Sequence, residues 1–140
     1  IDNKQLLTTK CDILIPAALE NQITEEVAEN LNCRLVIEAA NGPTTAQADA
    51  VLERRGIYLL PDILTNAGGV VVSYCEWVQN LQSLTWDENE VNALLFKVMT
   101  RALEDVYHKA RDYKISYRLA AYAVAVERIC KAKAKRGIFP

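Results

Sequence analysis

The chain has 140 residues, of which 51% are hydrophobic and 24% charged, and its formal net charge is −2. This composition is typical of one globular domain and excludes a disordered, collagenous or disulfide-dense protein. A nucleic-acid-binding protein usually carries a basic excess, and a membrane-spanning helix needs roughly 20 apolar residues in a row. Neither feature is present, so we expect no nucleic-acid partner and no membrane association.

Several smaller features bear on the origin of the chain. It begins with Ile1 rather than Met and has no signal peptide, which suggests a piece of a longer protein. Its four cysteines form no C-x-x-C pair, and its single histidine cannot complete a zinc cluster. We therefore expect no metal site, buried free thiols and a cytoplasmic location. The free-thiol prediction concerns Cys11, Cys33, Cys75 and Cys130.

The first half of the chain alternates apolar runs with amphipathic stretches. Strands are predicted at 12–15, 34–38 and 57–60, where prolines stop the first and the third. Thr24 is expected to cap a helix over 24–31, and Thr44 with Gln47 fits a capping box for a helix over 44–55, after which Gly56 ends it. Nearly continuous apolar strands joined by helices are typical of a parallel sheet buried on both faces.

The second half of the chain reads as helices only. A helix over 69–82 is followed by a long amphipathic helix that Thr85 and Glu88 would cap, and Ser116 would cap a last helix that Gly137 ends. The short basic run near the C-terminus then lies in the last helical turn, where cations complement the dipole. Apolar residues gather on one side of the first and last of these helices: Val70, Tyr74, Trp77, Val78 and Leu81, then Leu119, Tyr122, Val126, Ile129 and Cys130.

These patterns predict an α/β fold. The βαβαβ unit over about 11–64 is half of a doubly wound parallel, Rossmann-type sheet, with the three strands side by side in chain order. The helical part over about 66–137 completes one unit, 1–140, which is the C-terminal half of a dinucleotide-binding domain. The first strand would keep one open edge, which favours association.

Ligands of open α/β sheets bind beyond the carboxyl ends of the strands. Asn41 and Asn66 follow two of these ends, and their amides offer the donor and acceptor that a carboxamide needs. An Asn-Gly pair can equally be a plain turn, so Asn41 alone is undecided, but the three strand ends together favour ligand binding. Ser73, one turn into a helix, can bind a carboxylate or its own backbone four residues earlier. His108 is interpreted as a solvated surface residue.

Four segments together resemble the glutamate dehydrogenases, within the glutamate, leucine, phenylalanine and valine dehydrogenase family. The similar stretches are 16–24, 38–45, 61–70 and 72–80, and the match extends from about residue 11 to residue 137. Two positions depart from the family pattern. Ala39 stands where a glycine is common, which suggests a slightly different backbone near Asn41, and Cys75 stands where an aromatic residue is common.

The resemblance implies oxidative deamination of glutamate to 2-oxoglutarate and ammonia, with NAD or NADP as cofactor. It implies that backbone at Ala17 and Ala18 lines the dinucleotide cleft and that Asn41 and Asn66 contact the nicotinamide half. It also implies that two residues meet the substrate, Val70 and Ser73, with Ser73 on the side-chain carboxylate.

The family's catalytic lysine and aspartate and its glycine-rich turn have no counterpart in this chain. We therefore assign no catalytic residue here and expect the chain to be inactive alone. Its expected partners are the missing N-terminal part of the same enzyme, which carries the substrate domain, and further copies in a homo-oligomer. The alternative is a non-catalytic binding or interaction module built on half of a dinucleotide fold.

Overall fold

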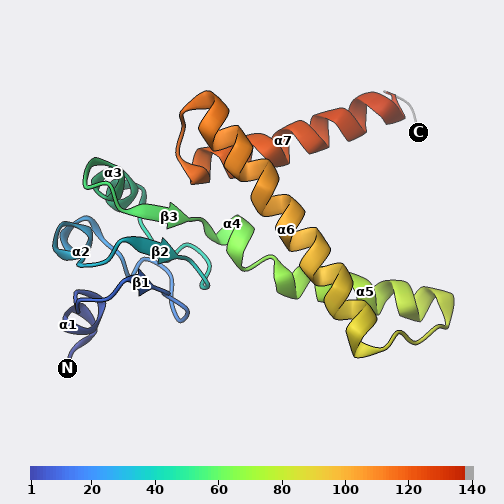
Figure 1. Ribbon diagram of the computed structural model, residues 1–140, viewed down its shortest axis with the longest axis horizontal. Helices are drawn as coiled ribbons and strands as arrows, with labels where there is room; N and C mark the ends of the chain where they lie inside the picture. Colours follow the sequence, from blue (N-terminus) through green and yellow to red (C-terminus); the bar gives the residue numbers. More distant parts are fainter. Residues whose placement is uncertain (138–140) are drawn as a thin grey trace.

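Three short parallel strands form the sheet that the sequence predicts. In the computed structural model, which describes residues 1–137, β1 (Ile13–Leu14), β2 (Leu35–Ile37) and β3 (Tyr58–Leu60) lie side by side in that order (Figure 1). Leu35 of β2 pairs in parallel register with Ile13 on one side and Tyr58 on the other. The predicted strand order and direction are confirmed, as is the α/β class.

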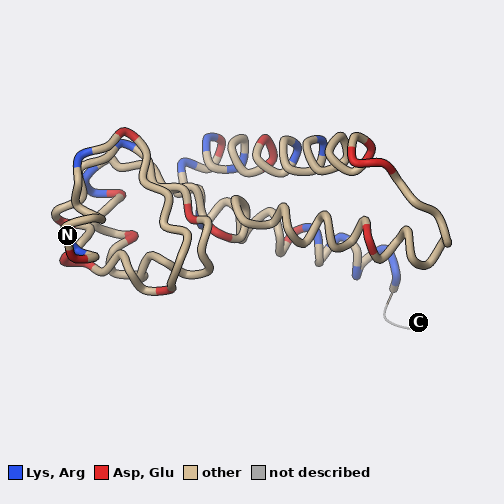
Figure 2. Tube along the Cα trace, turned by 90° about the horizontal axis from the view of Figure 1, so that it is seen from below, with Lys and Arg blue, Asp and Glu red and all other residues tan. Residues whose placement is uncertain are grey.

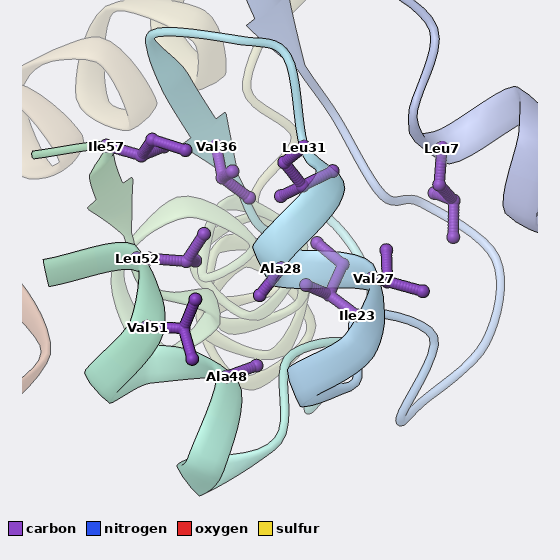
Figure 3. Close-up of a cluster of buried hydrophobic side chains, with 10 residues drawn as sticks. All are labelled: Leu7, Ile23, Val27, Ala28, Leu31, Val36, Ala48, Val51, Leu52 and Ile57. Atoms are coloured by element: carbon purple, nitrogen blue, oxygen red, sulfur yellow. The ribbon is translucent and has the colours of Figure 1, made fainter. Parts of the chain in front are cut away.

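The crossover helices cover one face of this sheet. They are α2 (Glu25–Asn30) and α3 (Ala46–Arg54), and the short α1 (Asn3–Leu7), which the sequence analysis missed, packs beside them. Thr24 caps α2 as predicted, because its hydroxyl accepts a hydrogen bond from the Val27 N–H at 3.4 Å. The apolar side chains between helices and sheet form the main core, shown in Figure 3: Leu7, Ile23, Val27, Ala28, Leu31, Val36, Ala48, Val51, Leu52 and Ile57.

The start of α3 differs from the prediction by one residue. Thr45, not Thr44, is the N-cap, and its hydroxyl accepts from the Ala48 N–H at 3.2 Å. Thr44 is held in an isolated parallel bridge with Ile23, so its backbone is extended and the helix cannot begin there. The Thr44 hydroxyl is buried and has no hydrogen-bond partner in residues 1–137. Gly56 follows the helix with φ +69°, as predicted.

The prediction that the sheet is buried on both faces is wrong for this chain. Ile13, Ile15 and Tyr58 point away from the core and are 51%, 55% and 65% exposed. The reason is that α1, α2 and α3 all pack on the same face. β1 pairs only with β2, so its other edge stays open within the described part of the chain.

Within the described residues, four helices follow the sheet. They are α4 (Asp62–Thr65), α5 (Gly68–Gln82), α6 (Glu88–Tyr113) and α7 (Tyr117–Arg136). In Figure 1, α5 runs away from the sheet, α6 returns along it, and α7 packs across the sheet-proximal end of α6. Asp87 with Glu90 forms the capping box of α6, in place of the predicted Thr85 and Glu88. Ser116 caps α7 and Gly137 ends it, both as predicted.

The apolar residues predicted on one side of α5 and α7 do not form the packed faces. Most of them are exposed, with Val70 at 74% and Ile129 at 68%. The buried faces instead carry small residues, because helices that cross closely need short side chains at the contact. Cys75 is the buried residue of α5, and the second core contains Leu64, Val106, Ala110, Ala120 and Ala121.

Charged residues of both signs are distributed along the described chain, as Figure 2 shows, and the basic run lies at the end of α7. No helix within residues 1–137 is long and apolar enough to cross a bilayer. All four cysteines are free thiols, but only Cys75 is buried and Cys130 is exposed, so the predicted burial is wrong for Cys130. His108 is exposed, as interpreted.

Candidate functional site

The carboxyl ends of β2 and β3 bring two asparagines together. Asn66 Nδ2 donates a hydrogen bond to Asn41 Oδ1 at 2.6 Å and lies 3.4 Å from the Ala39 carbonyl oxygen. Asn41 is exposed and Asn66 is half-buried. The bond uses one donor and one acceptor of the pair. The Asn41 amide nitrogen and the Asn66 carbonyl oxygen therefore remain free to bind a ligand that is both donor and acceptor.

The third strand end adjoins the same turn. The Pro16 carbonyl accepts hydrogen bonds from the N–H groups of Ala39 and Ala40, at 3.0 and 2.9 Å. Ala17 and Ala18 follow directly and are exposed, so small side chains leave backbone accessible there. Ala39 adopts no positive φ, so a glycine is not required at this position. All three strand ends that the sequence singled out therefore lie at one edge of the sheet.

Val70 and Ser73 lie three residues apart in the first turns of α5, which starts just after Asn66. Both side chains are exposed, and the Ser73 hydroxyl makes no hydrogen bond with any described residue. The alternative in which Ser73 bonds to its own backbone is not adopted. Its hydroxyl is therefore free to donate to an anionic ligand beside the helix N-terminus.

A cluster of charged side chains, which the sequence analysis did not predict, lies next to the turns at this edge of the sheet. Arg118, in the first turn of α7, donates to Glu38 Oε1 at 2.8 Å and to Asp49 Oδ1 at 3.1 Å, and its Nη1 lies 3.5 Å from Asp62 Oδ1. Glu38 is completely buried. A cation in a first helical turn opposes the helix dipole, and that anomaly was the available indication that Arg118 has carboxylate partners.

The cluster keeps its cation charged. Burial of Arg118 acts against the charge, but the hydrogen bonds that Arg118 donates to Glu38 and Asp49 outweigh it and raise the pKa of the guanidinium above its ordinary value. The net effect is a permanent positive charge next to a buried carboxylate, which is the arrangement that a buried carboxylate needs.

A cleft of about 570 Å³ lies between the β3 edge and the turn joining α6 to α7, and Arg118 and Asp49 of the charged cluster are among its lining residues. Its lining includes Tyr58, Arg111, Lys114 and Tyr117, and burial raises the pKa of the Tyr117 phenol. None of the residues that the sequence assigned to a site lines this cleft. Within residues 1–137, no group of three or more His, Cys, Asp or Glu side chains is arranged to hold a metal ion.

The parallel sheet with crossover helices places this chain among the open α/β proteins, whose ligands bind beyond the carboxyl ends of the strands, where the two amides lie. Comparison with known proteins agrees and is more specific. The family described as glutamate/leucine/phenylalanine/valine dehydrogenase matches residues 1–137. The chain belongs to this family.

Individual relatives show how much of such a protein the chain spans. It is 50% identical over 137 residues to the cryptic catabolic NAD-specific glutamate dehydrogenase of Bacillus subtilis, covering 98% of the chain and 32% of that protein. It is similar in structure to the glutamate dehydrogenase of Peptoniphilus asaccharolyticus, with 50% identity and a TM-score of 0.84 over 89% of this chain and 32% of that one. It is also similar to the hetero-hexameric glutamate dehydrogenase of Thermus thermophilus in its leucine-bound form, with 29% identity and a TM-score of 0.93 over 100% of this chain and 34% of that one. The chain therefore spans about a third of the length of the relatives it matches.

Proposed function

We propose that this chain is the part of an NAD(P)-dependent glutamate dehydrogenase that binds the nicotinamide end of the cofactor and the distal end of the substrate. The reaction is the oxidative deamination of glutamate to 2-oxoglutarate and ammonia. The observation that carries the proposal is the hydrogen-bonded pair of Asn41 and Asn66 at adjacent strand ends, beside the exposed Val70 and Ser73. The NAD-specific relative supports the cofactor class.

The asparagine pair matches the nicotinamide carboxamide group by group. The Asn41 amide nitrogen donates to the carboxamide oxygen, and the Asn66 carbonyl oxygen accepts from the carboxamide N–H. Because Asn66 Nδ2 is already bonded to Asn41 Oδ1, each side chain is held in the orientation that this contact requires. Ala17 and Ala18 contribute backbone to the wall of the dinucleotide cleft, where larger side chains would keep the cofactor away.

Val70 and Ser73 define the substrate side of the site. The Ser73 hydroxyl donates to the side-chain carboxylate of glutamate, and Val70 contacts the aliphatic part of the same side chain. A site that hydrogen-bonds a substrate group rejects analogues lacking that group far better than an apolar pocket rejects an extra methylene. Ser73 therefore selects glutamate over apolar amino acids.

The chemistry itself needs groups that this chain does not supply. Hydride transfer requires the cofactor ring to be held against the substrate and a base that manages the protons of the amino group. We assign those roles, and the pyrophosphate-binding turn, to the remaining two-thirds of the enzyme. Its packing would also cover the exposed sheet face at Ile13, Ile15 and Tyr58. Assembly into a homo-oligomer belongs to the same proposal; the hetero-hexameric Thermus thermophilus relative supports assembly into an oligomer of some kind.

Two measurements test the proposal. The full-length enzyme is expected to reduce NAD or NADP in the presence of glutamate, followed by the absorbance of the reduced nicotinamide. The isolated chain is expected to show no turnover and a dinucleotide Kd no better than roughly millimolar by calorimetry, the scale of a few weak contacts. Micromolar binding by the isolated chain would favour the alternative of a self-sufficient binding module.

Ser73→Ala in the full-length enzyme tests the substrate contact. Loss of one hydrogen bond to a charged group costs roughly 1.5–3 kcal/mol, so kcat/KM for glutamate should fall about 10- to 150-fold. Ser83→Ala, at the opposite end of α5, is the matched control and should leave kcat/KM unchanged. Equal kinetics for the two variants would remove Ser73 from the site.

A further inference from the structure

We propose that Arg118, at the start of α7, is a positioning residue that fixes the two cofactor-binding amides, Asn41 and Asn66, relative to each other. The inference rests on the proposed function, in which this pair binds the nicotinamide carboxamide. Arg118 donates a hydrogen bond to neither amide in the described part of the chain. It acts through carboxylates that lie between α7 and the strand ends.

The first link is the contact between α7 and three other elements. The Arg118 guanidinium reaches Glu38 just after β2, Asp49 in α3 and Asp62 in α4. Glu38 is fully buried, and the side chains of Arg118 and Asp62 are each 19% exposed. The guanidinium therefore joins groups that are 69 and 80 residues away in the sequence into one cluster.

The second link joins the carboxylates to the turns that carry the amides. Glu38 Oε2 accepts a hydrogen bond from the Asp62 N–H at 2.9 Å, and Asp62 Oδ2 accepts one from the Gly42 N–H at 2.8 Å. The Thr65 hydroxyl donates to the Glu38 carbonyl at 2.6 Å. Gly42 directly follows Asn41, and Thr65 directly precedes Asn66. The turn at 61–66 is thus bonded to the Glu38 carboxylate and to its backbone carbonyl, and the turn at 40–43 is bonded to the Asp62 carboxylate.

The charges of the cluster explain why Arg118 is needed. Glu38 and Asp62 are close like charges, and both must accept hydrogen bonds from backbone N–H groups to hold the turns. Arg118 is the cation that faces them, while Asp49 adds a further negative charge from α3. Without Arg118, the buried Glu38 carboxylate lies beside two other acids with no cation to compensate their charges, which favours its displacement. Displacement of Glu38 would break its hydrogen bond to the Asp62 N–H and so loosen the connection between the turns at 40–43 and 61–66.

The three carboxylates can be contacted together only by a side chain with several donor nitrogens, which the Arg118 guanidinium provides. Its nitrogens serve Glu38, Asp49 and Asp62 at the same time, whereas a lysine ammonium is a single point charge on a flexible stem. Arg118→Lys should therefore keep the charge but lose part of the positioning, and Arg118→Met should lose both.

The test uses the full-length enzyme and two cofactors, NAD and an analogue in which an acetyl group replaces the carboxamide. The acetyl group keeps the acceptor oxygen and lacks the N–H donor, so a correctly placed pair should prefer NAD by about 10-fold in kcat/KM, the scale of one hydrogen bond. Arg118→Met is expected to reduce this preference toward one, mainly through a higher KM for NAD, with Arg118→Lys in between. Arg128→Met is the control, because Arg128 is on the same helix and bridges α7 to Asp105 of α6, away from the strand ends.

The outcomes separate the two levels of the argument. Failure of the wild-type enzyme to oxidise glutamate, or an Asn66→Ala variant that keeps the wild-type preference, would overturn the proposed function and this inference with it. Suppose that Asn66→Ala abolishes the preference for NAD, while Arg118→Met lowers stability but retains that preference. This result would refute the positioning role of Arg118 and leave the proposed function standing. Should Arg118→Met fail to fold, the preference measured for the folded Arg118→Lys variant decides, and an unchanged value counts against the role.

Discussion

Leu52→Ala tests whether the packing between α3 and the sheet stabilises the fold as described. Leu52 is 1% exposed and lies in α3 beside Val51 and Ile57, among the side chains of Figure 3. The substitution removes three buried carbons at about 0.8 kcal/mol each, or about 2.4 kcal/mol. The cavity left behind adds to this, so the free energy of unfolding should fall by about 3–4 kcal/mol.

The assay is urea denaturation of the purified chain followed by circular dichroism. With a slope of about 1–3 kcal/mol per molar urea, the midpoint should fall by about 1–4 M while the slope stays the same. Leu81→Ala is the matched control, since Leu81 is also helical but 67% exposed, and it should change stability by less than about 0.5 kcal/mol. A loss below about 1 kcal/mol for Leu52→Ala, or equal losses for the two variants, would refute the assignment of this core.

Two further substitutions address contacts between helices. The Arg55 guanidinium donates hydrogen bonds to the backbone carbonyls of Ala28 and Leu31 at the end of α2, the latter at 2.8 Å. Arg55→Ala should therefore lower the free energy of unfolding by about 1–2 kcal/mol, measured by urea denaturation. An unchanged free energy of unfolding would mean that water replaces the contact. The hydrogen bond from Lys109 of α6 lowers the pKa of Glu127 in α7. The ion pair therefore contributes stability above the ordinary carboxyl pKa of 4.5 and loses it as the pH falls through the lowered value. In a plot of melting temperature against pH, Glu127→Gln should reduce the loss of stability on the acid side. If that loss is unchanged in the variant, it is due to other carboxylates.

The α/β half-sheet and the edge where the proposed site lies could be predicted from local sequence patterns. Continuous apolar runs stopped by Pro16 and Pro61 and joined by capped helices allow only a parallel βαβαβ arrangement, and its strand ends must meet at one edge. Because Asn41 and Asn66 follow adjacent strand ends, their proximity followed from the strand order, and the 2.6 Å bond between them agrees with it. These are local patterns whose consequences depend on periodicity and chain direction alone.

Which helix surfaces pack against each other could not be predicted from the sequence and depends on the tertiary structure. Amphipathic spacing shows that α5 and α7 have apolar sides, but the packed faces are the ones with small residues such as Ala120 and Ala121, because close helix crossing selects for size as well as polarity. The helix start at Thr45 likewise depended on a bridge between Thr44 and a residue 21 positions earlier. The Arg118 cluster could not be derived from spacing either. Its partners lie up to 80 residues away, and a buried charge finds its counter-charge in space, after the elements have packed.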